Sequence, residues 1–398
     1  MSLRVRTSFT QDIESRRAGR RVAEEIRDAF GQIRLASVLV YATVNHDQPV
    51  LLAAVREVLG EDVQIMGAST QGVMTRGKLV EAGFVVGAMG FGGSIATGIQ
   101  LVEEVQSSTR EKGRSLGRSL KAGLQGEAKV ILLHYDPLCG VDAQVFLDGL
   151  HDEVGECPVV GGAAGQPWGR MIQTFQYFGT RVLSHGAVAM ALDGPFGVEI
   201  GVSHGTSATG VTSIVTRADK NVVLEIDDRP ALDVMRAMTG CTSEVPSTEE
   251  NSSWAIGLPR DGEEHGAKRP MMVRAVFGYD FERRGVVLQA AIAEGTSVMF
   301  HHRTVESVMS GTREMALDLS ARLHGRRVVA GLGFECAARV APFLGEQGAL
   351  DENLALQRQV APEGQWLGMI AWGEVAPWGD RPGFHNYTYP VLLLTEPG

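Results

Sequence analysis

The sequence GASTQG at residues 67–72 directly follows an apolar run, and GGAAGQ at residues 161–166 follows another. Each stretch is typical of a strand that enters a tight turn, because glycine adopts backbone conformations that other residues avoid. The elements around the two stretches also come in the same order. We therefore predict that residues of about 30–120 and 121–205 are two copies of one βαβββ unit.

The hydrophobic spacing gives the first elements of each copy. Continuous apolar runs at 36–44 and 128–135 are typical of strands buried on both faces, and helical spacing follows at 49–59 and 141–154. An amphipathic helix at 12–30 precedes the first copy. This half of the chain is therefore predicted to be α/β.

The two glycine turns are equivalent in the duplication, so packing of the copies would bring them together. A cleft between them is one expectation, with Ser69 and Thr70 of the first turn as candidate ligand-binding residues. The alternative is that both turns are only tight strand connections.

The pattern changes after about residue 205, and we place a domain boundary between residues 1–217 and 218–398. The second part contains alternating runs typical of antiparallel strands and a helical pattern at 305–323. Polar stretches at 242–253 and 260–269 are predicted to be exposed loops. The C-terminal domain is therefore expected to be α+β with a mostly antiparallel sheet.

Composition excludes several classes of protein. The net charge is −10, and 44% of the residues are hydrophobic, which is typical of a globular protein without the basic surface of a nucleic-acid binder. No run is long enough to span a membrane, and the N-terminus lacks a signal-peptide core. The four cysteines form no CxxC pair. We expect a cytoplasmic protein that binds neither nucleic acid nor membrane.

Signature motifs of the common hydrolases, kinases and nucleotide-binding enzymes are absent from the sequence. Cys336 is a candidate nucleophile, because it ends an apolar run and precedes a predicted helix at 337–344. The helix dipole and Arg339 would lower the pKa of its thiol, and Glu374 and His385 could complete a catalytic group. The alternative is a small buried hydrophobic residue.

Several of these segments together resemble the FIST family. In the N-terminal part the resemblance rests on 67–72, 161–165 and 221–232, and in the C-terminal part on 292–295, 334–339, 373–374 and 385–388. It covers essentially the whole chain. The resemblance implies a FIST N-terminal domain followed by a FIST C-terminal domain.

The resemblance implies a sensory protein that binds a small ligand, such as an amino acid. Such a protein would signal through a separate partner, such as a histidine kinase. Some family members resemble haem-based nitric-oxide sensors, and for that alternative His204, at the domain junction, is our candidate axial ligand. The opposing class is an enzyme that depends on Cys336.

The C-terminal segments that resemble the family also lead us to predict a ligand site. We expect it to include Cys336, Arg339 and Glu374, together with His385, Asn386 and Thr388 of the last segment. Arg339 would hold an anionic group of the ligand and Glu374 a cationic one. Alternatively, Arg339 and Glu374 pair with each other.

Overall fold

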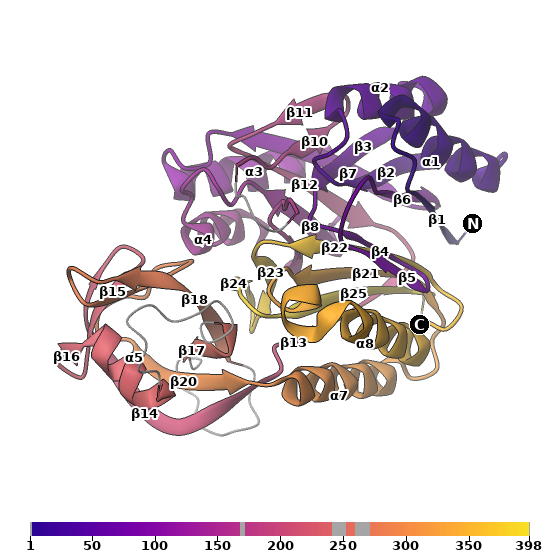
Figure 1. Cartoon of the computed structure of the whole chain (residues 1–398). Helices are drawn as coiled ribbons and strands as arrows, with labels where there is room; N and C mark the ends of the chain where they lie inside the picture. Colours follow the sequence, from indigo (N-terminus) through magenta and orange to yellow (C-terminus); the bar gives the residue numbers. More distant parts are fainter. Residues whose placement is uncertain (1, 168–171, 241–251, 259–270, 398) are drawn as a thin grey trace.

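The computed structural model describes residues 2–167, 172–240, 252–258 and 271–397 (Figure 1). Its strands form three six-stranded sheets and one seven-stranded sheet. Helices and strands mix throughout, and in the C-terminal six-stranded sheet only β21 and β22 are parallel. The predicted fold class is therefore confirmed. Most of the two predicted polar loops lies outside the described residues.

Unit 1 begins with a strand and an amphipathic helix, whose N-cap residue Glu14 accepts hydrogen bonds from two backbone N–H groups of the first turn. Its elements are β1 (Leu3–Thr10), α1 (Ser15–Phe30), β2 (Leu35–Ala42), α2 (Gln48–Leu59), β3 (Gln64–Ser69), β4 (Val73–Thr75), β5 (Lys78–Val80) and β6 (Val86–Gly93).

Unit 2 repeats this order, but neither unit has the predicted bounds of about 30–120 and 121–205, and each begins with a strand and a helix that the predicted βαβββ copy does not include. Its elements are β7 (Ala96–Glu103), α3 (Thr109–Gly123), β8 (Val130–Tyr135), α4 (Ala143–Val154), β9 (Val159–Gly162), β10 (Gln176–Phe178), β11 (Arg181–Leu183) and β12 (Gly186–Asp193).

The same order occurs a third time, which the sequence did not lead us to expect. Unit 3 consists of β13 (Gly197–Ser203), α7 (Val305–Leu323), β21 (Val328–Cys336), α8 (Gly345–Val360), β22 (Gln365–Ala371), β23 (Glu374–Trp378), β24 (Arg381–His385) and β25 (Tyr389–Thr395). A short π-helix, Val340–Leu344, lies between β21 and α8. The third copy is hard to recognise because about a hundred residues are inserted between its first strand and first helix.

The inserted residues form the seven-stranded sheet, which we call the insert. Its elements are β14 (Thr206–Asp219), β15 (Val222–Ile226), β16 (Arg229–Pro230), α5 (Ala231–Thr239), β17 (Trp254–Leu258), β18 (Met272–Asp280), β19 (Gly285–Leu288) and β20 (Ser297–Arg303). The pairing closes on itself because β15 also pairs with β14. In Figure 1 the insert lies below and to one side of the three units.

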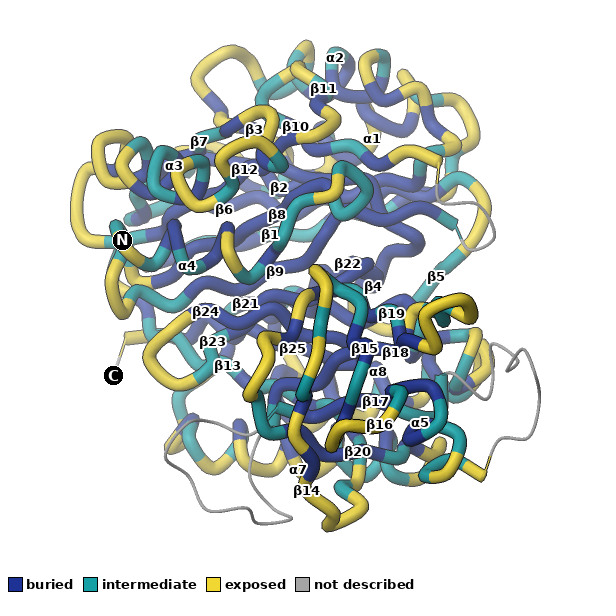
Figure 2. Tube along the Cα trace, turned by 90° about the vertical axis from the view of Figure 1, so that its left-hand side faces the viewer, coloured by how far each residue is buried: buried dark blue, intermediate teal, exposed yellow. Residues whose placement is uncertain are grey.

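The three units exchange hairpins. The β4–β5 hairpin of unit 1 extends the sheet of unit 3, β10–β11 of unit 2 extends the sheet of unit 1, and β23–β24 of unit 3 extends the sheet of unit 2. Each six-stranded sheet therefore has the same strand order and contains a hairpin from another unit. Their inner faces share one apolar core, while the helix pairs α1–α2, α3–α4 and α7–α8 cover the outer faces. Figure 2 shows the strands buried and the outer loops exposed.

The turns after β3, β9 and β22 meet where the three units join, and backbone hydrogen bonds connect them in a ring. Gln71 N donates to Ile370 O at 3.4 Å, Gly165 N to Ser69 O at 2.8 Å, and Trp372 N to Ala163 O at 3.3 Å. Each turn thus donates to the strand end of another unit. The two glycine turns come together as the duplication predicts, and the third unit completes the contact.

One glycine position explains how closely the strands approach near this ring. Gly67, Gly161 and Gly368 each lie opposite the second strand of their own unit, which is β2, β8 and β21 respectively. A Cβ atom there would lie 1.8 Å, 2.0 Å and 2.9 Å, respectively, from a backbone carbonyl oxygen of that strand. Backbone cannot move away as a flexible side chain can, so these positions require glycine.

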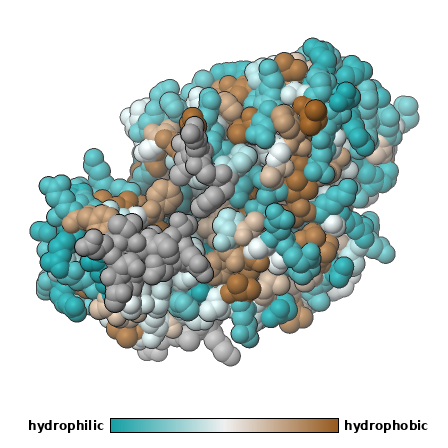
Figure 3. Space-filling view, in the orientation of Figure 1, coloured by the Kyte–Doolittle hydropathy of each residue, from teal (hydrophilic) through white to brown (hydrophobic). Residues whose placement is uncertain are grey.

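The outer surface is mixed in character. In the space-filling view, apolar residues reach the surface in several places between hydrophilic ones (Figure 3). Among the described residues, no helix is both long and apolar enough to cross a membrane.

Gly67→Ala should destabilise the protein strongly, because its new methyl group would overlap the carbonyl oxygen of Val40. We expect the free energy of unfolding to fall by at least about 2 kcal/mol. Gly278→Ala is the matched control, since nothing lies within 4 Å of a Cβ atom at that position, and it should change stability by less than about 0.5 kcal/mol. Chemical denaturation measures both; equal effects would contradict this account of the strand contact.

Candidate functional site

Five of the predicted site residues come together at one end of unit 3. Cys336 ends β21, Glu374 begins β23 and His385 ends β24, where it lies opposite Glu374 in the hairpin. Asn386 and Thr388 lie in the connection to β25. Cys336 N donates to Thr388 O at 3.0 Å, which joins the end of β21 to that connection.

Glu374 is fully buried, and its closest hydrogen bonds come from Thr388. Its Oε2 accepts hydrogen bonds from Thr388 N at 3.1 Å and from Thr388 Oγ1 at 2.9 Å. Burial raises the pKa of Glu374 to about 8, although the Thr388 bonds, the Cys336 thiol and Arg339 act in the opposite direction. The carboxyl group is therefore mostly protonated at neutral pH.

The expected lowering of the Cys336 pKa is wrong. Burial raises the pKa of the thiol well above its usual range, and the nearby Glu374 raises it further. The reason is local structure: Cys336 is still part of the strand, and the helical turn begins only at Val340. The thiol consequently does not lie in the first turn of a helix, and its nucleophilic form is disfavoured.

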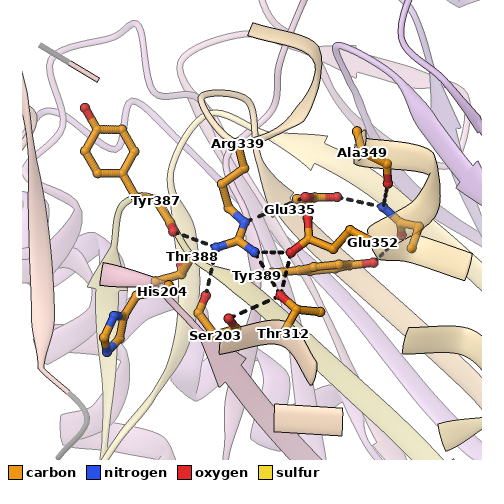
Figure 4. Close-up of polar contacts among 12 residues, drawn as sticks. Ser203, His204, Thr312, Glu335, Arg339, Ala349, Glu352, Tyr387, Thr388 and Tyr389 are labelled. Atoms are coloured by element: carbon orange, nitrogen blue, oxygen red, sulfur yellow. Dashed lines mark hydrogen bonds and ion pairs between the residues drawn. The ribbon is translucent and has the colours of Figure 1, made fainter. Parts of the chain in front are cut away.

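Arg339 is completely buried and bonded on several sides (Figure 4). Its Nη2 lies 2.5 Å from Glu352 Oε1 and donates to Thr312 Oγ1 at 3.0 Å. Its Nη1 donates to Tyr387 O at 3.2 Å and to Ser203 O at 3.5 Å. The carboxylate that pairs with Arg339 is therefore Glu352, not Glu374.

A second carboxyl group lies beside this pair. Glu335 Oε1 is 3.7 Å from Arg339 Nε, and its Oε2 accepts from Asn353 Nδ2 at 2.9 Å. Burial raises the pKa of Glu335 well above its usual range, and Glu352 raises it further. One carboxylate, that of Glu352, thus balances the charge of Arg339, while Glu335 is held protonated.

Asn386 and His385 face the insert. Asn386 Oδ1 accepts from Ala275 N at 3.1 Å, and its Nδ2 donates to Gln289 Oε1 at 2.6 Å. Neither ring nitrogen of the buried His385 makes a well-formed hydrogen bond among the described residues, although the backbone of Ala376 lies near enough to raise its pKa. Burial, assisted by Arg274, lowers the pKa of His385 to about 3, so its imidazole is neutral.

Ser69 and Thr70 lie in the ring of turns. Ser69 Oγ donates to Gly165 O at 2.9 Å and accepts from Phe175 N at 2.9 Å. Thr70 Oγ1 bonds backbone groups of Gly72 and Ile370. Both hydroxyls thus bind backbone of the adjoining turns, which connects them to the segment that leads into Glu374.

His204 lies on the connection between β13 and the insert. Its Nδ1 accepts from Thr206 N at 3.1 Å and lies 2.8 Å from Thr206 Oγ1. Burial lowers the pKa of His204 to about 4, and His301 and Arg339 lower it further. The next residue packs tightly, since a Cβ on Gly205 would lie 2.4 Å from Val308 Cα. A neutral imidazole is the form that binds haem iron.

Sequence reasoning missed the cations that the insert contributes. Arg274 of β18 and Arg303 of β20 are both almost fully buried, and each donates to a backbone carbonyl of unit 3, at Phe384 and Ala338 respectively. Burial lowers the pKa of each guanidinium to about 10. Nothing in the sequence marks them, because each is one arginine in an alternating strand.

Two family models match most of the chain. A model of the FIST N domain matches residues 36–229, and a model of the FIST C domain matches residues 231–377. The chain belongs to the FIST family. FIST domains are sensory domains of signal-transduction proteins. The FIST C match includes Cys336, Arg339 and Glu374, whereas His385, Asn386 and Thr388 lie beyond its end.

Curated relatives of this FIST protein are uncharacterized. One, from Mycobacterium tuberculosis, is 24% identical over 404 residues and is covered completely, as is this chain. Another, from Mycobacterium bovis, is 26% identical over 218 residues, a match that spans 54% of this chain and 55% of that protein. The chain thus covers about half the length of the latter relative.

Among solved structures, this FIST protein is similar to a cyanuric acid hydrolase from A. caulinodans. The TM-score is 0.41 and the sequence identity 7%, with both chains covered completely.

Arg339→Ala should unfold the site even without ligand, because it leaves Glu352 and Glu335 buried without their cation. We expect a loss of about 3–5 kcal/mol in the free energy of unfolding. The control is Arg322→Ala, which removes a half-exposed partner of Glu199 and should cost at most about 1 kcal/mol. A small effect of Arg339→Ala in denaturant titrations would contradict a structural ion pair.

Glu374→Gln should change how stability depends on pH. Below about pH 4.3 the carboxyl is protonated in both the folded and the unfolded chain. Between about pH 4.3 and the folded-state pKa of about 8, the unfolded chain releases the proton while the folded chain keeps it. Glu374 therefore lowers the free energy of unfolding of the wild type as the pH rises through this window. The other titratable groups that act on it are Tyr135, Cys336 and Arg339.

The variant carries no such proton, so its stability relative to wild type should increase with pH across this window, by at most about 1.4 kcal/mol per pH unit. Melting temperatures at several pH values measure this. The exposed Glu61 provides the control Glu61→Gln, which should show a flat difference. A flat difference for Glu374→Gln would mean that its carboxyl is not protonated in the folded protein.

Proposed function

We propose that this FIST protein binds a small polar ligand, of the amino-acid class, where Cys336, Glu374, His385, Asn386 and Thr388 meet the insert. It would signal by noncovalent contact with a separate signalling protein, such as a histidine kinase. The observation that carries the proposal is the gathering of buried ionisable groups, several incompletely bonded, between unit 3 and the insert.

Buried polar groups in folded proteins are nearly always hydrogen-bonded, since an unpaired one costs about 1–3 kcal/mol. Among the described residues, neither ring nitrogen of His385 makes a well-formed hydrogen bond, and Oε1 of Glu374 has no well-formed partner while its Oε2 accepts from Thr388. Such unpaired groups destabilise the folded protein. Hydrogen bonds from a polar ligand would offset that loss of stability.

Glu374 suits the cationic group of an amino acid. A ligand ammonium placed against it would favour the ionised carboxylate and release the proton that burial now holds there. Arg339 would not contact the ligand directly, because its donors already bind Glu352, Thr312 and the backbone of Tyr387. In this role it fixes the connection that carries Thr388.

The ligand would couple the insert to the three units. Chain continuity joins the insert to unit 3 only where β13 passes into β14 and where β20 passes into α7. Asn386 bonds across the same boundary to Ala275 and Gln289. A ligand at this boundary would shift the position of the insert, which a partner protein could detect.

Thermal unfolding in the presence of each standard amino acid tests the proposal. At least one should raise the melting temperature of the wild type in a concentration-dependent way and be recovered unchanged, as a ligand bound only by the folded state must. Glu374→Gln should weaken the effect, and Glu61→Gln should not. Stabilisation by none of them, or consumption of the ligand, would refute the proposal.

The haem-based alternative predicts a different experimental result. If His204 bound haem iron, the protein would develop a Soret band with added haem, and His204→Ala would change it. An unchanged spectrum after haem addition excludes nitric-oxide sensing through haem, while leaving the amino-acid proposal untouched.

A further inference from the structure

Arg303 is a buried cation in this region that has no counter-ion among the described residues. Its side chain is almost completely buried, and only Nη2 has a partner, the carbonyl oxygen of Ala338 at 2.8 Å. Nε and Nη1 carry the remaining donors, and both are buried without a hydrogen-bond partner among the described residues. An unpaired buried guanidinium is costly, and burial lowers its pKa to about 10.

The carboxyl groups nearby do not compensate for this charge. Glu352 is already paired with Arg339 at 2.5 Å, and burial keeps Glu335 and Glu374 protonated near neutral pH. The Cys336 thiol is also protonated. The positive charge of Arg303 is therefore in excess and has no carboxylate partner among the described residues.

Two aromatic rings determine how a ligand could reach Arg303. The guanidinium carbon lies 3.9 Å from the ring centroid of Phe343 and 4.0 Å from that of Tyr387. These contacts occupy the faces of the guanidinium, so its N–H donors remain accessible only at the edges. A planar carboxylate accepts hydrogen bonds in that plane and carries the single negative charge that the excess requires.

We infer that Arg303 is the anchor for a small monocarboxylate ligand, bound between β20 of the insert and the Ala338–Phe343 and Tyr387 segments of unit 3. The inference rests on the proposed function and deepens it by naming the group that holds the ligand's anionic end. Arg303 ends β20, one residue before the N-cap of α7. The ligand therefore binds where the insert joins unit 3.

Arg274 is also buried without a counter-ion among the described residues, but it has fewer unpartnered nitrogens than Arg303. Arg274, the other buried cation of the insert, donates to Phe384 O and lies 5.3 Å from the Phe384 ring centroid, with one unpartnered nitrogen, Nε. Arg303 has two such nitrogens, Nε and Nη1. Arg303 is thus the better anchor of the two.

The test uses sodium acetate as the probe, titrated against sodium chloride at matched ionic strength, with the full chain and thermal unfolding as readout. Acetate should stabilise the wild type, and Arg303→Met should bind it at least about 30-fold more weakly, the loss typical of truncating one partner of a buried charge pair. Arg322→Met, which removes a half-exposed arginine, should respond to acetate like the wild type.

Each alternative outcome is decisive. No stabilisation by acetate, equal stabilisation of wild type and Arg303→Met, or stabilisation by phosphate but not acetate overturns the inference. If Arg303→Met does not fold, Arg303→Lys provides the test, because its ammonium retains the charge but lacks the planar donors. Unaltered acetate binding by Arg303→Lys would also overturn the inference.

The proposed function can fail or survive separately. If an amino acid stabilises the wild type and Arg303→Met to the same extent, the anchor is wrong and the sensory ligand site stands. If no amino acid stabilises the wild type, the proposed function itself fails.

Discussion

Three backbone hydrogen bonds hold the centre of this protein together, because each passes from the turn of one unit to the strand end of another. The ring requires strands that approach more closely than side chains permit, which is why Gly67, Gly161 and Gly368 occupy equivalent places beside it. Since each turn also begins the segment that carries a hairpin into a different sheet, the ring and the exchanged hairpins depend on each other. Neither could form from one unit alone.

The candidate site follows from this exchange. The turn of unit 3 that closes the ring leads directly into Glu374 and the β23–β24 hairpin, which pairs with β9 of unit 2. The hairpin therefore carries Glu374 and His385 to a place fixed by a different unit, while the insert covers them from outside through Asn386. Three parts of the chain that are remote in sequence thus define the surroundings of a few buried polar groups.

The arginines around the site differ in what balances their charge. Arg339 has Glu352 at ion-pair distance and bonds to the backbone, so removing it would expose buried charge and weaken the fold. Arg303 has aromatic rings on its faces and one carbonyl partner, so its guanidinium is stacked but its charge is not neutralised. The first arrangement stabilises a structure, and the second is suited to a group that arrives from solution.

The sequence by itself determined the local elements, the duplication of the first two units and the segments that resemble FIST domains, because spacing of apolar residues and glycine turns are local signals. It also led to the prediction of a ligand site with Cys336, Arg339, Glu374, His385, Asn386 and Thr388, and ligand binding there stays a prediction. Only the tertiary structure decided that a third unit completes the ring, that Cys336 is a buried strand residue with a raised pKa, and that Glu352 pairs with Arg339 while Arg303 has no counter-ion. Those outcomes depend on which groups are brought together and removed from water, and burial and charge pairing are properties of the packed chain that neighbouring residues in sequence do not encode.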